Sequence, residues 1–276
     1  MSKEFKISVL MSVYKKENPE YLLQAIQSML EQTFLPSEIV LVEDGPLTES
    51  LYQTLDSIEQ QSKVPIKRIA LPKNVGLGLA LREGLLHCQY EYVARMDTDD
   101  LSVPHRLEWQ KNAMIEQKVD IVGGHIAEFI DKPTEIVSLR KVPLEHQAIV
   151  NYQRMRSAFN HVTVLFKKSV ALAAGNYEDG LYMEDDLLWL NMIDVNAKMS
   201  NIDETLCYVR VGAGMFERRG GYKYLKLYQQ ARYLMYKRKQ ISYIEYIESI
   251  AFQVLVALVP KNVRKYIFLN LLRQKN

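Results

Sequence analysis

Residues 92–100 of the chain read YVARMDTDD, a short run that passes from largely apolar residues directly into three carboxylates. Its first half predicts a buried strand over residues 92–96. Asp97, Asp99 and Asp100 follow, and carboxylates this close repel one another unless a cation or hydrogen-bond donors neutralise them. An Asp-x-Asp turn can present hard oxygen ligands to Mg²⁺ or Mn²⁺. The alternative interpretation is a solvated turn whose aspartates cap the next helix.

The strand pattern recurs along the chain and alternates with helical patterns. Strands are expected over residues 6–12, 38–42, 66–71, 92–96, 121–130 and 161–166. Helices are expected over residues 19–32, 48–61, 76–88, 106–117, 144–154, 168–174 and 185–196, and throughout 222–276, where Pro260 separates two segments. Such alternation implies βαβ units and a mostly parallel sheet with helices on both faces. The sequence therefore predicts one α/β domain with a helical C-terminal extension.

Further polar groups are expected near the carboxyl ends of these strands, where ligands bind in open α/β sheets. Glu43 and Asp44 end the second expected strand. Residues 74–78 (NVGLG) form a glycine-rich helix start, but they lack a dinucleotide fingerprint and a Walker lysine, so a plain helix entry is the simpler interpretation. Residues 184–186 (EDD) open another expected helix, where carboxylates suit the helix dipole as well as catalysis.

The formal net charge of +2 hides a strong asymmetry along the chain. From Arg210 to the end there are 14 Lys and Arg against 3 Asp and Glu, whereas residues 1–209 carry a net charge of −9. An acidic body with a basic tail indicates that the tail faces something anionic: nucleic acid, a membrane surface or a phosphorylated substrate. Arg210, Arg218 and Arg219, which stand near several glycines, form a basic loop that suits phosphate binding, and a solvated loop is the alternative.

Composition also limits the compartment. Two cysteines cannot form a disulfide framework, which favours a reducing cytoplasm. The apolar run at residues 7–14 is short and is not followed by a cleavage site, so no signal peptide is expected. The apolar run at 250–259 is too short to cross a bilayer as a helix.

Taken together, the motifs resemble glycosyltransferase family 2. The resemblance lies in SVLMSVYKKENPEYLLQAIQSMLEQT, EIVLVEDG, KNVGLGLALREGL, ARMDTDD with PHRLE, GNY and EDDLLW, in this order. The stretch from NHVTVLFKKS to VRVGAGMFERRGGYKY is most similar to the branch that makes amylovoran, capsule and O-antigen. The match covers about residues 1–225, and it implies an inverting GT-A-fold (Rossmann-like) enzyme that uses nucleotide sugars and Mn²⁺ or Mg²⁺.

The resemblance also implies roles for individual residues. Asp185 would be the general base, Asp99 the direct metal ligand, and Asp97 a metal ligand nearer the ribose. Asp44 would accept the N3–H of uracil, which makes a UDP-linked donor the expected one. The remaining donor-binding residues would be Ser12, Val13, Tyr14, Glu43, Asn74, Arg82, Glu184, Arg218 and Arg219.

Two departures from the family pattern affect these expectations. Many relatives carry a histidine after the Tyr-Arg of the late strand as a further metal contact, and residues 208–212 (YVRVG) have none. Metal binding would then rest more on the carboxylates and the diphosphate. The Gln-x-x-Arg-Trp motif of processive synthases is also absent, so addition of a single sugar is expected.

The resemblance suggests a division of the chain and a set of partners. Residues 1–221 would form the glycosyltransferase domain and residues 222–276 a basic helical extension. The acceptor would be a saccharide or an undecaprenyl-diphosphate-linked saccharide, at the cytoplasmic face of the cell membrane. The extension would dock on anionic lipid rather than nucleic acid, or else pack on the domain or in a homodimer. A nucleotidyltransferase and a catalytically silent binding module are the alternative functions.

Overall fold

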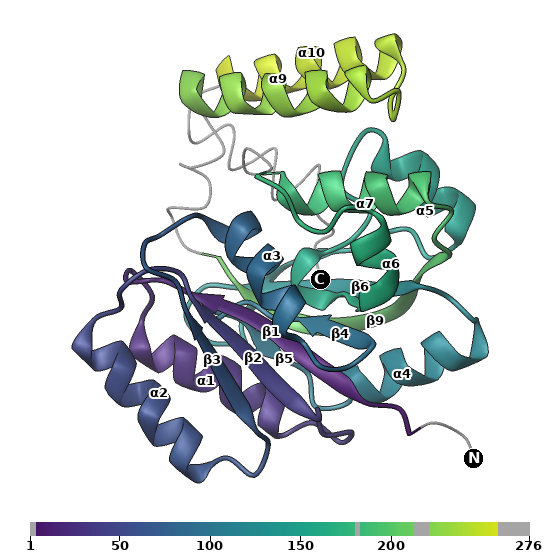
Figure 1. Cartoon of the computed structure of the whole chain (residues 1–276). Coiled ribbons are helices and arrows are strands. Elements are labelled where there is room, and N and C mark those ends of the chain that lie inside the picture. The colour runs from purple at the N-terminus through teal and green to yellow at the C-terminus, as the bar shows by residue number, and fades with distance from the viewer. Residues whose placement is uncertain (1–3, 180–182, 212–220, 259–276) are drawn as a thin grey trace.

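The computed structural model describes residues 4–179, 183–211 and 221–258 (Figure 1). The strands are β1 (Ile7–Val13), β2 (Glu38–Glu43), β3 (Ile66–Ala70), β4 (Tyr92–Arg95), β5 (Leu101–Ser102), β6 (Ile121–Phe129), β7 (Ile136–Arg140), β8 (Leu165–Lys167) and β9 (Met199–Arg210). The helices are α1 (Pro19–Leu30), α2 (Glu49–Gln61), α3 (Leu77–His87), α4 (Arg106–Glu116), α5 (His146–Gln153), α6 (Lys168–Ala173), α7 (Glu184–Asp194), α9 (Gly221–Lys237) and α10 (Tyr243–Leu258).

One sheet runs through the molecule in the order β3-β2-β1-β4-β8-β6-β9-β5, with β7 paired to β6. The first four strands of this order are parallel, as the alternating pattern predicts. Beyond β4 the sheet is mixed, because β8 is antiparallel to both β4 and β6 while β6 and β9 are parallel. The α/β class is therefore confirmed, and the parallel arrangement holds for the first half of the sheet.

Three sequence-based elements need correction. The C-terminal region was expected to be helical from residue 222 with a break at Pro260, but α9 ends at Lys237 and α10 begins at Tyr243, because Lys239 adopts a left-handed backbone conformation (φ 61°) between them. The strand expected over residues 161–166 is a 3₁₀ turn at His161–Thr163 followed by β8, because the amide and hydroxyl of Thr163 both donate to the carbonyl of Asn160. The idea that the aspartates after β4 cap the next helix is wrong. The strand β5 follows them, and α4 begins without a side-chain cap.

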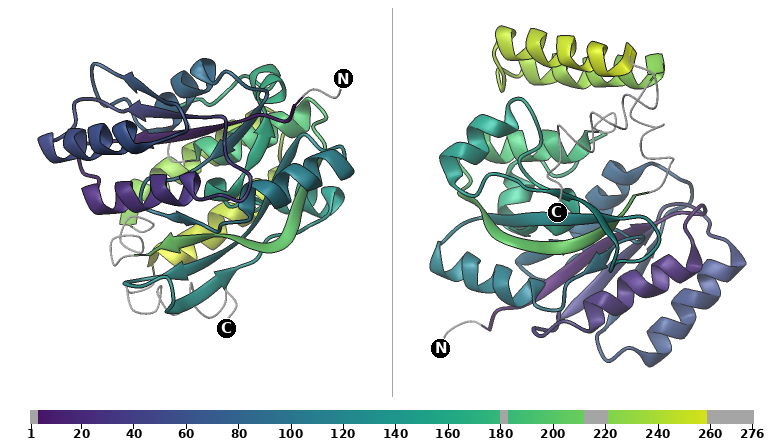
Figure 2. Two further views of the ribbon diagram at one scale, coloured as in Figure 1. Left: turned by 90° about the horizontal axis from the view of Figure 1, so that it is seen from below. Right: turned by 180° about the vertical axis from the view of Figure 1, so that it is seen from behind.

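Helices cover both faces of the sheet (Figures 1 and 2). The helices α1, α2 and α4 pack on one face, where Val9 and Met11 of β1 point into a continuous apolar core. On the other face α3, α6 and α7 cover a second core around Leu10 and Trp189. Strand residues that alternate between two buried faces explain why β1 and β2 are apolar almost throughout.

A buried arginine fixes the point where β4 ends. The guanidinium of Arg106, on α4, has no exposed surface and donates to the carbonyl of Arg95 at 2.7 Å and to Gln110 at 3.0 Å. Gln110 in turn donates to the carbonyls of Val122 (2.9 Å) and Thr163 (2.7 Å). Burial lowers the pKa of Arg106, although a guanidinium remains protonated at neutral pH. Helix α4 thereby holds together the ends of β4, β6 and the 3₁₀ turn.

The helices α9 and α10 form a hairpin that packs on α7 (Figure 1). Leu187 and Leu190 of α7 share a small core with Met235 and Ile241. Arg238 adds a two-pronged ion pair with Glu178 at 2.6 and 2.9 Å. Residues 259–276, including Pro260, lie outside the described residues. Among the described residues, none of the helices combines the length and the hydropathy that a membrane span requires.

Candidate active site

The acidic run after β4 forms the centre of the site. Asp97, Asp99 and Asp100 bring one carboxylate oxygen each to within 4.8 Å of one another. Asp100 is buried, whereas Asp97 and Asp99 are partly exposed. Among the residues that the structure describes, this is the only group of three His, Cys, Asp or Glu side chains with this spacing.

Basic and polar groups contact the acidic run. Arg95, the last residue of β4, is 2% exposed and forms an ion pair with Asp97. The hydroxyl of Thr98 points toward the loop after β1, where it donates to Glu17 at 2.7 Å and to the carbonyl of Ser12 at 3.3 Å. The amide of Arg210 donates to Asp100 Oδ1 at 2.8 Å.

The carboxylates carry more negative charge than these contacts neutralise. Burial, together with the charges of Asp97 and Glu17, raises the pKa of Asp99 to about 7. Burial and both neighbouring aspartates also raise the pKa of Asp100 well above its ordinary value. A hard divalent cation would relieve this repulsion and prefers oxygen ligands, so the donor set fits Mg²⁺ or Mn²⁺. Asp97 and Asp99, the two more accessible carboxylates, are the residues that would hold it.

Helix α7 brings a second carboxylate group to the same site. Its first turn contains Glu184, Asp185 and Asp186, as the sequence predicts. Burial and the two neighbouring carboxylates raise the pKa of Asp185 to about 8. Burial raises the pKa of Glu184 as well, and the charges of Arg95 and Asp97 act on this group. The two acidic groups therefore belong to one electrostatic environment.

A glycine allows α7 to approach α3 this closely. A Cβ atom at Gly78 would lie 2.5 Å from the carbonyl oxygen of Glu178 and 2.9 Å from Cβ of Glu184. The glycine-rich start of α3 is thus a packing surface for the segment that carries the second acidic group. It was expected to be a plain helix entry, and the sequence alone holds no signal for this contact.

Asp44 and Glu43, at the end of β2, already have partners within the protein. Asp44 accepts hydrogen bonds from the amides of Val75 (2.7 Å) and Gly76 (3.1 Å) and from the side chain of Asn74 (2.9 Å). Glu43 accepts one from Arg68 Nε at 2.6 Å. Asp44 thus fixes the loop before α3, while its Oδ1, with one donor, can still accept a second hydrogen bond.

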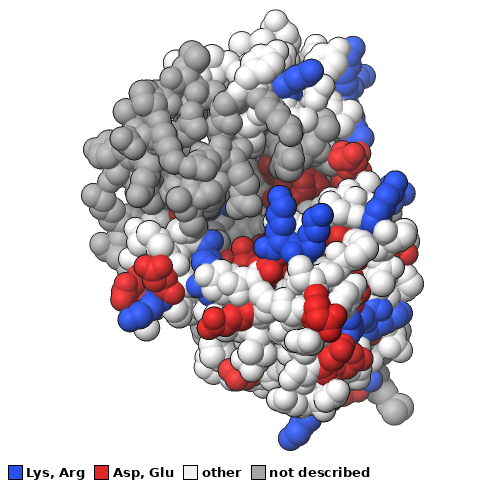
Figure 3. All heavy atoms as spheres, turned by 90° about the vertical axis from the view of Figure 1, so that its left-hand side faces the viewer, with Lys and Arg blue, Asp and Glu red and all other residues white. Residues whose placement is uncertain are grey.

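The structure describes some of the other expected donor-binding residues. The carbonyl of Val13, at the end of β1, accepts a hydrogen bond from the amide of Asp44 at 2.8 Å. The next residue, Tyr14, is 38% exposed. Arg82 is exposed on α3. Arg218 and Arg219 lie outside the described residues. Acidic side chains gather between the main body and the helices above it, with Lys and Arg side chains beside them (Figure 3).

Two features of the site escaped the sequence analysis. Arg95 stands in the quoted strand but received no role, although a charged residue within a buried strand is itself a signal of a paired charge. Arg210 was grouped with the basic loop, whereas it is the last residue of β9 and contacts the acidic run directly.

Comparison with families of known proteins gives a consistent result. The model described as "Glycosyl transferase family 2" matches residues 8–172. A Haemophilus influenzae protein named as an uncharacterized glycosyltransferase is 41% identical over 98% of this chain and all of its own length. The amylovoran biosynthesis glycosyltransferase AmsE of Erwinia amylovora is 37% identical over 95% of this chain and 97% of its own. An Escherichia coli UDP-Gal:alpha-D-GlcNAc-diphosphoundecaprenol beta-1,3-galactosyltransferase is 34% identical, covering 98% and 97%.

Solved structures share the fold. Staphylococcus aureus TarS 1-349 in complex with UDP-GlcNAc superposes with a TM-score of 0.62 at 18% identity, covering 95% of this chain and 70% of that one. The mannosyltransferase PcManGT of Pyrobaculum calidifontis, in complex with GDP-Man and Mn²⁺, gives 0.64 at 15% identity, covering 84% and 64%. The expected GT-A fold is therefore confirmed.

The raised pKa of Asp99 predicts how pH affects stability without metal. Asp99 holds its proton up to about pH 7 in the folded protein but only to about pH 4 when unfolded. The folded state therefore binds more protons in this window, and the free energy of unfolding falls as pH rises through it. Asp99→Asn removes this contribution, so in EDTA its melting temperature should exceed that of the wild type by a few degrees at pH 8 and by less at pH 5.

Thermal unfolding with and without Mn²⁺ measures this effect. Mn²⁺ should raise the melting temperature of the wild type and have little effect on Asp99→Asn. Glu116→Gln, a change at an exposed carboxylate on α4, is the control and should follow the wild type throughout. A variant with the same pH profile and the same Mn²⁺ response as the wild type would contradict the assignment.

Proposed function

Because the chain belongs to glycosyltransferase family 2, we propose that it is an inverting, metal-dependent enzyme that transfers one sugar from a UDP-sugar to a saccharide. The proposed acceptor is linked to undecaprenyl diphosphate, and the product enters a bacterial surface polysaccharide. The observation that carries the proposal is the shared electrostatic environment of two acidic groups: the aspartates after β4 and the first turn of α7. One group suits a metal-bound diphosphate, and the other suits an acceptor hydroxyl.

The relatives support the donor and acceptor classes. One relative that is 34% identical over nearly the whole chain is named for UDP-Gal and for a diphosphoundecaprenol-linked acceptor. Uracil, unlike cytosine, carries an N3–H, and a carboxylate can accept a hydrogen bond from that group. Asp44, whose Oδ1 has one donor, is the proposed acceptor for that group, with Ser12 and Tyr14 beside the base.

The proposed reaction uses both acidic groups. A divalent cation held by Asp97 and Asp99 would neutralise the charge that develops on the departing diphosphate. Asp185 takes the proton of the acceptor hydroxyl, whose oxygen forms a bond to the anomeric carbon on the side opposite the diphosphate. The bond to the diphosphate oxygen breaks, and UDP leaves with its electron pair. Once deprotonated, Asp185 is a stronger base than an ordinary carboxylate because its pKa is raised to about 8.

Substitution of Asp185 tests its role as a general base. Asp185→Asn should bind UDP-sugar as the wild type does, while kcat falls by about 10²–10⁴. Asp186→Asn is the matched control, because Asp186 lies in the same helical turn and accepts a hydrogen bond from Gln153 at 2.7 Å. It should lose about 1 kcal/mol of stability and keep near-normal turnover. An Asp185→Asn enzyme that turns over normally would leave only a helix-dipole role for this residue.

The outer face of α10 supports the proposed contact with a membrane. Ile244 (67% exposed), Ile247 (45%) and Leu255 (66%) share one side of the helix, flanked by Tyr243 and Phe252. The opposite side packs on α9, where the ring of Tyr246 stacks on that of Tyr236. Packing on the protein thus accounts for one face of the hairpin and leaves a largely apolar face, which also includes the exposed Glu248, uncovered among the described residues.

Charge favours an anionic lipid surface as the partner of this face. Residues 210–276 carry 14 Lys and Arg against 3 Asp and Glu. Two of these acidic residues, Glu245 and Glu248, lie on α10, which contains no Lys or Arg, so the basic charge comes from the rest of the segment. A basic segment with an apolar face binds anionic membranes through burial of its apolar surface and through attraction between its basic residues and the lipid headgroups. Each basic residue near the surface contributes about 1 kcal/mol. The enzyme then works at the cytoplasmic face of the cell membrane, where it meets a lipid-linked acceptor.

Co-sedimentation with vesicles tests the docking face. The full chain should bind phosphatidylglycerol vesicles, bind phosphatidylcholine vesicles poorly, and lose binding as salt rises. Ile244→Glu with Leu255→Glu should weaken binding at least several-fold, while transfer to a soluble acceptor analogue continues. Ile115→Glu, at a 54% exposed isoleucine on α4, is the control. Equal binding by the double variant and the wild type would contradict the docking face.

A further inference from the structure

Arg210 joins three elements at the edge of the acidic run. Its Nε donates to the main-chain carbonyl of Asp99 at 3.2 Å, and its own amide donates to Asp100 Oδ1 at 2.8 Å. Its Nη2 donates to the side chain of Gln24, on α1, at 3.1 Å. One residue at the end of β9 thus contacts two consecutive members of the acidic run and a helix on the other side of it.

Aromatic rings fix the orientation of this guanidinium. Its central carbon lies 3.8 Å from the ring centroid of Tyr21, on α1, and 4.7 Å from that of Phe129, on β6. Stacking of this kind suits arginine and does not suit lysine. Gln24 is itself held, because its amide donates to Glu20 at 3.2 Å. The direction of the Arg210 side chain is therefore set by three neighbouring side chains, the rings of Tyr21 and Phe129 and the amide of Gln24.

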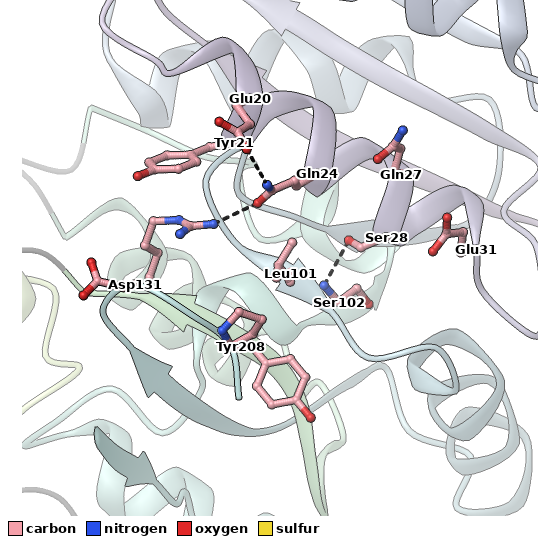
Figure 4. Close-up of a pocket in the computed structure, with 12 residues that line it drawn as sticks. Glu20, Tyr21, Gln24, Gln27, Ser28, Glu31, Leu101, Ser102, Asp131 and Tyr208 are labelled. Atoms are coloured by element: carbon pink, nitrogen blue, oxygen red, sulfur yellow. Dashed lines mark hydrogen bonds between the residues drawn. The ribbon is translucent and has the colours of Figure 1, made fainter. Parts of the chain in front are cut away.

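Arg210 also forms part of the wall of a cavity of about 530 Å³ between α1, β5 and β9. Tyr21 and Gln24 point into this cavity from α1, and a dashed line marks the hydrogen bond that Gln24 accepts (Figure 4). Ser102 closes the cavity on the side of the acidic run, two residues after Asp100. The side chain of Arg210 thus lines the cavity and also contacts the backbone of the acidic run.

We infer that Arg210 is a positioning residue for the metal site, which holds the Asp99–Asp100 backbone so that the carboxylate of Asp99 faces the cation. The inference rests on the metal dependence in the proposed function. Groups that hydrogen-bond to the residues around a metal fix the direction of the ligands, and their loss typically weakens metal binding 10- to 100-fold. Arg210 contacts the carbonyl of Asp99 rather than its carboxylate, so it orients the ligand without competing for it.

The sign of the effect separates positioning from simple electrostatics. A guanidinium beside a cation site repels the cation, so removal of its charge alone would tighten Mn²⁺ binding. Loss of positioning would weaken it. Arg210→Leu removes both the charge and the hydrogen bonds and keeps apolar contact with the rings. Arg210→Lys keeps the charge but cannot bridge Asp99 and Gln24 while stacked between two rings.

Isothermal titration with Mn²⁺ alone, without a nucleotide sugar, measures the effect directly. The dissociation constant for Mn²⁺ should rise about 10- to 100-fold in Arg210→Leu, and Arg210→Lys should also bind more weakly than the wild type. Arg238→Leu is the matched control: it breaks the ion pair with Glu178, away from the aspartates, so it should lower the melting temperature and leave Mn²⁺ affinity unchanged.

Each outcome decides one point. A wild-type protein that binds no Mn²⁺ overturns the metal site itself, and the inference with it. Wild-type Mn²⁺ binding that stays the same or becomes tighter in folded Arg210→Leu overturns the positioning role and leaves the metal site intact. If Arg210→Leu does not fold, Arg210→Lys decides, and an unchanged affinity in that variant overturns the inference.

Discussion

The site depends on the mutual repulsion among three aspartates. Buried arginines offset part of this negative charge and hold the end of the strand that carries it. Asp97, Asp99 and Asp100 stand within 4.8 Å of one another at the end of a buried strand. Arg95 supplies the charge that pairs with Asp97, and Arg106 fixes the carbonyl of Arg95 from the far side of the strand. These contacts hold the end of β4 next to the three carboxylates.

The arrangement of the sheet explains why these groups meet. The parallel strands β2, β1 and β4 end at one edge, which brings Asp44, the Ser12 carbonyl and the acidic run together. The mixed half of the sheet then returns β9 to the same edge, so that Arg210 reaches the acidic run. Helix α7 crosses over α3, and its first turn faces this edge from the second side of the sheet. The two acidic groups thus come from different layers of one fold.

The same helix connects the site to the hairpin of α9 and α10. The inward side of α7 contributes Leu188 and Trp189 to the main core, and Leu187 and Leu190 contact Met235 and Ile241. Gln240 donates to Asn191 and to Asp194 at 2.8 Å each, near the C-terminal end of α7. A surface on α10 is therefore linked through one packed helix to the turn that contains Asp185. In the proposed function this link sets the distance between the lipid surface and the general base.

Local signals predicted the first half of this molecule well. The strands β1, β2 and β4 are largely apolar runs closed by polar turns, and parallel pairing follows from the helices between the strands. In contrast, β9 contains the polar run Asn201–Thr205 and pairs with β6 and β5 over long sequence separations, which no local pattern reveals. For the same reason the contacts of Arg210 with Asp99 and Gln24, and the close approach of α7 to α3 at Gly78, could not be predicted. Acidic motifs were visible in the sequence, whereas the groups that hold them were not.

Titration of UDP into the protein with Mn²⁺ and with EDTA tests the central claim that the aspartates after β4 form a metal-dependent nucleotide site. The account predicts that UDP binds at least tenfold more tightly with Mn²⁺, and that Asp99→Asn removes this difference. Equal affinity for UDP in Mn²⁺ and in EDTA would contradict it.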